Sequence, residues 1–188
     1  VVSCRGAAEQ IHPLNDPRRK QALQEVLGLV DLIHCVSDDM RRTVESYGAP
    51  PERILVNRPA VPVDEFAPIV GRRQAHDGPR RVLSVGRLHW KKGFDDALRA
   101  IAALVRSGRA VDYRIAGEGA EREKLAFLIH QLGLGEHVTL LGVQRQEEIR
   151  DQLAWADVLL LPSLSEGISN AVLEGMAAGL PVVATRSG

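Results

Sequence analysis

The chain has 188 residues, of which 45% are apolar and 26% charged, a composition typical of globular proteins that excludes extensive disorder. Its 24 basic residues balance 24 acidic ones, so no broad positive field is available to bind a nucleic acid. No apolar run approaches the roughly 20 residues that span a bilayer, so any membrane contact is expected to be peripheral. The six histidines are dispersed and no His, Cys or Asp cluster has metal-ligand spacing, so we expect no metal and no other cofactor.

The first third of the chain alternates strand-like and helical patterns. Strands are predicted within 1–4, 32–37 and 53–57, and helices over 17–30 and 38–47, with Ser37 as the N-cap of the second helix. Cys4 and Cys35 fall in two strands that we expect to be neighbours. They are interpreted as reduced core thiols of a cytosolic protein, and a single disulfide between them is the weaker alternative.

Residues 57–79 are rich in proline and show no helical period. They are interpreted as an interdomain linker whose flexible part lies near Gly71 to Gly78.

From residue 82 onward, strands and helices alternate regularly. Short β-branched runs at 82–86, 112–117, 137–142, 157–162 and 181–185 are separated by amphipathic segments at 95–108, 121–134, 147–156 and 170–179. Strands that are apolar on both faces and separated by helices indicate a parallel sheet covered on both sides. The predicted fold class is therefore α/β, with a doubly wound, Rossmann-like sheet.

The segment VLSVGRLHWKKGFDDAL places basic side chains after a strand. Gly86 ends the strand, Arg87 follows it, and Lys91 and Lys92 precede Gly93 and a helix. Ligands of open α/β sheets bind at this carboxyl edge of the strands. Two or three positive groups there suit a diphosphate, whereas the alternative is an ordinary solvated basic loop.

The segment LPSLSEGISNAVLEGMAAGLPVVAT contains two spaced glutamates. Glu166 lies in a loop and Glu174 about two turns into the following helix. The free N–H groups of the helix start, near Gly167 to Asn170, favour phosphate, and carboxylates accept hydrogen bonds from sugar hydroxyls. Alternatively, Glu166 is a helix-start acid and Glu174 a surface residue. The Ala/Gly-rich surroundings of Glu174 nevertheless predict partial burial.

The segment IAGEGAEREKL resembles a dinucleotide fingerprint, but Arg122 occupies the third glycine position. We expect Gly117 and Gly119 mainly to permit a tight turn, with contact to a nucleotide base as a second role for Gly117. The broken pattern disfavours a nicotinamide-dependent dehydrogenase.

These three segments, in this order, resemble retaining glycosyltransferases of the GT-B type, and within them glycosyltransferase family 4, also called group 1. The resemblance implies that Arg87 and Lys92 bind the donor diphosphate and that Glu174 holds the ribose. It further implies that Glu166, with the backbone of Gly167, Ile168, Ser169 and Asn170, holds the transferred sugar. Glu166, Arg87 and Lys92 are the expected catalytic residues, and Gly86 and Gly117 are expected to be donor-binding.

The resemblance covers nearly the whole chain. It implies the end of an acceptor-side Rossmann-like domain at 1–68, a linker at 69–79, and a donor-binding Rossmann-like domain at 80–188. Both ends of the chain are expected to be cut, with the start of the acceptor domain and the end of the donor domain missing. We therefore expect this fragment to be inactive on its own.

The predicted function is hexosyl transfer, with retention and without a metal, from a nucleotide-diphosphate sugar to a saccharide or lipid-linked acceptor. Polysaccharide or cell-envelope glycan synthesis is the expected process. The expected location is the cytoplasm, with peripheral contact at the inner membrane face through the missing domain. Two alternatives stay open, a nucleotide-sugar epimerase of the same fold and a non-catalytic nucleotide-sugar-binding module.

Overall fold

The computed structural model describes residues 1–72 and 75–187. Contacts divide them into two compact units, which are treated separately here. The first contains residues 1–60, with segment 165–169 and the end of the chain from Arg186. The second contains residues 61–164 and 170–185. Among the described residues, no helix is both long and apolar enough to cross a membrane.

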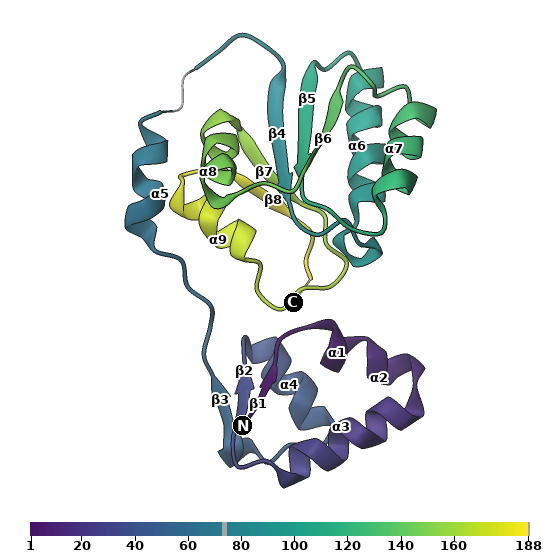
Figure 1. Ribbon diagram of the computed structural model, residues 1–188, viewed down its shortest axis with the longest axis vertical. Coiled ribbons are helices and arrows are strands. Elements are labelled where there is room, and N and C mark those ends of the chain that lie inside the picture. The colour runs from purple at the N-terminus through teal and green to yellow at the C-terminus, as the bar shows by residue number, and fades with distance from the viewer. Residues whose placement is uncertain (73–74, 188) are drawn as a thin grey trace. The chain divides into compact units, whose positions relative to one another are not determined.

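The N-terminal unit is a three-stranded parallel sheet with helices (Figure 1). Its elements are β1 (Val2–Cys4), α1 (Ala7–Gln10), α2 (His12–Asn15), α3 (Pro17–Leu29), β2 (Ile33–Cys35), α4 (Asp38–Ser46) and β3 (Ile54–Val56). The strand order is β1-β2-β3. As predicted, the Ser37 side chain caps α4, because its oxygen accepts the backbone N–H of Met40 at 3.1 Å.

Cys4 and Cys35 lie directly opposite each other on β1 and β2, and both are free and buried. They pack with Leu27 and Met40 in the core of this unit. Burial raises the pKa of the Cys4 thiol to about 12 and also raises that of Cys35. Both thiols therefore stay protonated, as expected of core residues.

The C-terminal unit contains a five-stranded parallel sheet in the order β6-β5-β4-β7-β8 (Figure 1). Its elements are α5 (Val63–Val70), β4 (Arg80–Val85), α6 (Phe94–Arg106), β5 (Val111–Ala116), α7 (Arg122–Gln131), β6 (Val138–Gly142), α8 (Gln146–Trp155), β7 (Val158–Leu161), α9 (Asn170–Ala177) and β8 (Val182–Ala184). The predicted alternation of strands and helices is confirmed. The chain reverses its direction of travel across the sheet between β6 and β7, which makes the β4/β7 boundary the topological switch point.

Helices cover both faces of this sheet. One face packs against α6 and α7, around Ile101, Tyr113 and Leu125. The other packs against α5, α8 and α9, around Leu83 and Leu159. Because successive strand residues point to opposite faces, Val82 joins the first cluster and Leu83 the second.

The helix α5 was not predicted, since 57–79 was expected to lack helical structure. Pro68 inside this helix removes one backbone hydrogen bond, which masks its pattern in the sequence. The helix forms because Phe66 and Ile69 are 1% and 2% exposed in the core shared with α8 and α9. The first unit therefore ends at Ala60 and the second begins at Val61, whereas the linker was expected to begin at residue 69. Residues 73 and 74, part of the predicted flexible stretch, lie outside the described residues.

Candidate functional site

The carboxyl ends of β4 and β5 approach each other so closely that glycine is required there. Gly117, which follows β5, has a φ of +146°, and a Cβ on it would lie 1.9 Å from the carbonyl oxygen of Gly86. A Cβ on Gly119 would likewise lie 2.2 Å from the oxygen of Leu88. The two loops are joined by hydrogen bonds from Gly86 N to Ala116 O and from Leu88 N to Glu118 O, each 2.9 Å long. Gly117 and Gly119 therefore allow the two loops to come close enough for these hydrogen bonds to form.

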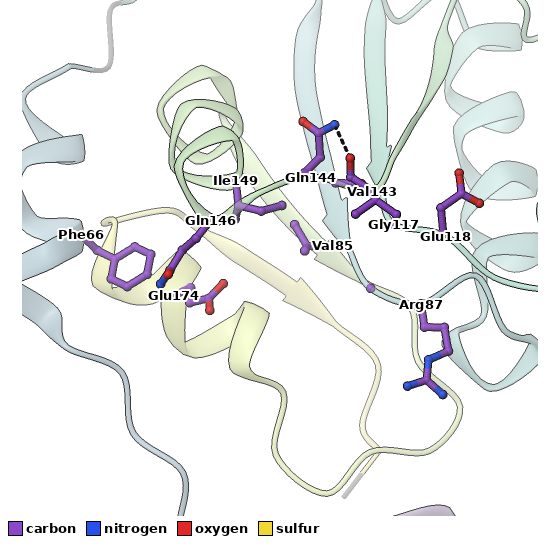
Figure 2. A pocket seen from close by; sticks show the side chains of 12 residues that line it. Phe66, Val85, Arg87, Gly117, Glu118, Val143, Gln144, Gln146, Ile149 and Glu174 are labelled. Atoms are coloured by element: carbon purple, nitrogen blue, oxygen red, sulfur yellow. Dashed lines mark hydrogen bonds between the residues drawn. The ribbon is translucent and has the colours of Figure 1, made fainter.

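A pocket of about 520 Å³ opens at this edge, within the C-terminal unit. Figure 2 shows Phe66, Gln146 and Glu174 on the side formed by α5, α8 and α9, whereas Arg87 emerges from the loop after β4. The lining residues are Phe66, Val85, Gly86, Arg87, Ala116, Gly117, Glu118, Val143, Gln144, Gln146, Ile149 and Glu174. A pocket that combines apolar walls with a few polar groups at the carboxyl edge of a parallel sheet is the usual form of a small-molecule site in such folds.

Two predicted cationic residues flank Gly86. The exposed Arg87 lines the pocket directly. Lys92 passes alongside, because a Cβ on Gly86 would lie 3.6 Å from its Cε. Lys92 is the last residue of a short 3-10 turn, and Gly93 follows as its C-cap. A Cβ on Gly93 would lie 2.0 Å from the carbonyl oxygen of Pro162, so glycine is required there. A guanidinium and an ammonium group beside a backbone without side chains can together neutralise the charge of a diphosphate.

Glu174 is the acidic residue of α9 that lines the pocket, and it is partly buried, as the sequence predicts. Burial raises the pKa of its carboxyl above the usual value, and the positive charge of Arg150 partly offsets this rise. A half-buried carboxylate in a pocket is a strong acceptor for ligand hydroxyl groups. Its predicted hydroxyl-binding role is compatible with this setting but stays a prediction.

The remaining predicted site residues, 166–170, do not line this pocket. Glu166, Gly167, Ile168 and Ser169 are partly buried in the loop between β7 and α9, and their contacts group this loop with the N-terminal unit. Asn170 is exposed and begins α9. The pocket lining within the C-terminal unit contains none of these five described residues. Their predicted role in holding a sugar stays a prediction.

Several pocket residues were not predicted. Gln144 and Gln146 follow β6, so the rule that points to Arg87 after β4 could also have pointed to them. The Gln144 side-chain amide donates to the backbone oxygens of Leu141 and Val143, at 3.2 and 3.1 Å. No local signal marks Phe66, because it reaches the pocket from a helix that precedes the sheet in the sequence. Among the described residues, no group of three or more His, Cys, Asp or Glu side chains could hold a metal ion.

The fold of this chain is shared by solved structures that are each about twice its length. The chain superposes on 46% of the sucrose-phosphate synthase of Thermosynechococcus elongatus, with a TM-score of 0.82, 23% identity and 94% of this chain covered. It also matches half of Anabaena HepE, solved in complex with UDP and glucose, with a TM-score of 0.77, 20% identity and 92% coverage of this chain. The chain is thus an α/β protein with parallel sheets and the fold of GT-B glycosyltransferases.

Sequence comparison gives the family. A family model described as "Glycosyl transferases group 1" matches residues 69–188. The amylovoran biosynthesis glycosyltransferase of Erwinia amylovora is 40% identical over 146 residues, covering 74% of this chain and 35% of that protein. The D-inositol 3-phosphate glycosyltransferase of Mycobacterium bovis is 34% identical over 181 residues, covering 92% and 37%. The chain belongs to the group 1 glycosyl transferases, and it spans less than half the length of these curated relatives.

Proposed function

We propose that this chain carries the donor-binding part of a retaining glycosyltransferase of family 4 that uses a nucleotide-diphosphate sugar. The observation that carries the proposal is the pocket at the carboxyl edge of the five-stranded sheet. It combines Arg87 with Glu174 across a backbone left bare by Gly86 and Gly117. Cationic groups and a carboxylate in one pocket suit a ligand that has phosphates at one end and hydroxyls at the other.

In this proposal, Arg87 and Lys92 bind the diphosphate and stabilise the negative charge that develops on it as the sugar leaves. Glu174 accepts hydrogen bonds from the ribose hydroxyls. Glu166, with the backbone of 167–170, holds the transferred hexose. No metal takes part, and the leaving phosphate guides the acceptor to the same face of the sugar, which retains the configuration.

The segments of the chain then have distinct tasks. Residues 1–60 of the N-terminal unit belong to the acceptor-side domain, and the C-terminal unit, which begins at Val61 and includes α5, binds the donor. The acceptor is a saccharide or a lipid-linked glycan, and the protein works in the cytoplasm, at or near the inner membrane face. Relatives named for amylovoran biosynthesis and for D-inositol 3-phosphate glycosyltransfer support a glycosyl transfer, and the former supports a role in polysaccharide assembly.

The proposal is tested by titrating the chain with UDP, GDP, UDP-glucose and GDP-mannose, followed by calorimetry and by backbone amide NMR. We expect at least one nucleotide to perturb the amides of Gly86, Gly117 and the start of α9. Glu174→Gln and Lys92→Ala should each weaken binding by about tenfold, because each removes a charge-assisted hydrogen bond. Glu147→Gln, an exposed carboxylate at the start of α8, is the matched control and should bind like the wild type.

A wild-type chain that is folded yet binds none of the four nucleotides, including at millimolar concentration, would refute the donor site. Equal affinities for the wild type and both pocket variants would show that the ligand binds elsewhere. Interconversion of a free nucleotide sugar without acceptor, assayed on a longer chain with the complete acceptor domain, would favour the epimerase. Binding without any transfer by that longer chain would favour the non-catalytic module.

A further inference from the structure

The loop between β7 and α9 makes two close contacts within the N-terminal unit, to which most of it belongs. The hydroxyl of Ser165 donates a hydrogen bond to Oε1 of Gln10 on α1, at 3.1 Å. A Cβ on Gly167 would lie 2.6 Å from the carbonyl oxygen of Arg5, so only glycine fits there without a shift of the backbone. The loop is therefore held on both sides of Glu166.

The orientation of the Gln10 amide is set by a carboxylate on its other side. Its nitrogen Nε2 donates to Oδ2 of Asp39 at 3.2 Å. Because an ionised carboxylate only accepts hydrogen bonds, the amide presents its NH2 group to Asp39 and its oxygen to Ser165. The hydroxyl of Ser165 then has to be the donor. These three side chains form one hydrogen-bond network, called here the Ser165–Gln10–Asp39 network, with a single direction of donation.

Asp39 is itself held at both of its carboxylate oxygens. Oδ1 accepts from the guanidinium of Arg42 at 3.3 Å, while Oδ2 accepts from Gln10. The residue lies in the first turn of α4, which is capped by Ser37, and α1 packs against this helix. The network therefore ends on a side chain whose position is fixed by its own helix.

The turn that joins β1 to α1 is held by Glu9. Its Oε2 accepts the backbone N–H groups of Arg5 and Gly6, at 3.2 and 3.0 Å. The backbone N–H of Gln10 in turn donates to the carbonyl oxygen of Gly6 at 3.1 Å. This turn supplies both the Arg5 oxygen that lies against Gly167 and the helix that carries Gln10. Both contacts of the loop thus start from the same ordered turn.

Glu166 lies between the two anchored residues of the loop. We propose that Gln10 is a positioning residue for the loop that carries Glu166. By accepting from Ser165 and donating to Asp39, it fixes this loop before any ligand binds. The role rests on the proposed function, in which Glu166 and the backbone that follows it hold the transferred sugar. A loop that is already ordered loses less conformational entropy on binding, so it contributes more to the affinity for that sugar.

The position of the loop is tested first without any ligand. Backbone amide shifts and order parameters of residues 165–169 are measured by NMR in the wild type, in Gln10→Leu and in Ser165→Ala. Both variants should shift these amide signals and lower the order parameters, because each breaks the hydrogen bond between α1 and the loop. Gln21→Leu removes a comparable side-chain hydrogen bond to Glu25 on α3 and is the matched control, which should leave residues 165–169 unchanged.

Exchanging donor and acceptor within the network separates positioning from a general loss of packing. Gln10→Glu alone brings two carboxylates together and should loosen the loop as Gln10→Leu does. In the double variant Gln10→Glu/Asp39→Asn, the amide introduced at position 39 donates to the carboxylate introduced at position 10, which still accepts from Ser165. The double variant should recover the wild-type order parameters. A double variant as loose as Gln10→Glu would show that these hydrogen bonds do not position the loop.

The consequence for the donor is measured by calorimetry on two pairs of ligands, UDP with UDP-glucose and GDP with GDP-mannose. Gln10 does not line the nucleotide pocket. Gln10→Leu should therefore weaken binding of the sugar nucleotide by about fivefold, and leave binding of the parent nucleotide unchanged. The double variant should restore the difference between the two. A general structural defect would instead weaken both members of a pair equally.

This proposal and the proposed function fail in different ways. If residues 165–169 keep their wild-type signals and order parameters in folded Gln10→Leu and Ser165→Ala, the positioning role is wrong, whatever binds. If the loop responds as expected but the wild type binds none of the four nucleotides, the donor site is wrong and the positioning role stands. Should Gln10→Leu not fold, Ser165→Ala and the double variant still decide, because both keep a polar side chain at position 10.

Discussion

The two parallel sheets of this chain differ in how many of their faces are covered. In the N-terminal unit, Cys4, Ile33 and Cys35 are buried on one face. On the other face the side chains are polar or exposed: Ser3 hydrogen-bonds to His34 at 2.8 Å, His34 contacts the carbonyl oxygen of Asn57 at 3.0 Å, and Leu55 is 50% exposed. In the C-terminal unit, apolar clusters lie on both faces.

The pocket lies in the unit whose sheet is covered on both faces. Parallel sheets are normally covered on both sides, and only the five-stranded sheet meets that condition among the described residues. The pocket lining comes entirely from the unit with this sheet. We therefore expect mutations to have larger effects on stability in the five-stranded sheet than at equivalent strand positions of the three-stranded one.

The largest effect is expected for Leu83→Ala. Leu83 on β4 is fully buried between the sheet and α8, so the substitution removes packing and leaves a cavity. The free energy of unfolding of the C-terminal unit should fall by about 2–5 kcal/mol. Hydrogen exchange of the β4 and β5 amides measures this loss. Unchanged exchange there, in a folded variant, would show that this face is not the packed core described above.

An intermediate effect of opposite sign is expected for Glu174→Gln. The pKa of Glu174 is raised in the folded chain, so its contribution to stability is fully present below the unfolded pKa and is lost as pH rises through the folded value. The Gln variant avoids this loss. It should melt at a higher temperature than the wild type at neutral pH, with a smaller difference near pH 4, as followed by circular dichroism. A variant that is less stable at neutral pH would contradict the burial of this charge.

The smallest effect is expected for Leu55→Ala on β3, the counterpart of Leu83→Ala in the three-stranded sheet. Half of the Leu55 surface is already exposed, so the free energy of unfolding should change by less than about 0.5–1 kcal/mol. Exchange of the β2 amides provides the measurement. A loss as large as that of Leu83→Ala would mean that the open face is packed against something in solution, and the contrast between the two sheets would disappear.

Much of the fold and part of the site were predictable because their signals are local. Alternating apolar runs and amphipathic segments predict each strand of the five-stranded sheet and the four helices α6 to α9. The carboxyl-edge rule leads to Gly86 and Arg87, which line the pocket. By contrast, α5 contains Pro68 and forms through packing with α8 and α9, so its helical pattern is weak and Phe66 was missed. The short helices α1 and α2 were missed as well.

By itself, the sequence determined the α/β class, the parallel sheet of the C-terminal unit and the kinds of side chain at its carboxyl edge, since these depend on periodicity and on residue order. Only the tertiary structure decided that α5 contributes Phe66 to the pocket, that Arg150 pairs with Glu65, and that one face of the three-stranded sheet is exposed among the described residues. These features arise from contacts between residues far apart in the chain, such as Arg150 with Glu65, and no local pattern encodes such contacts.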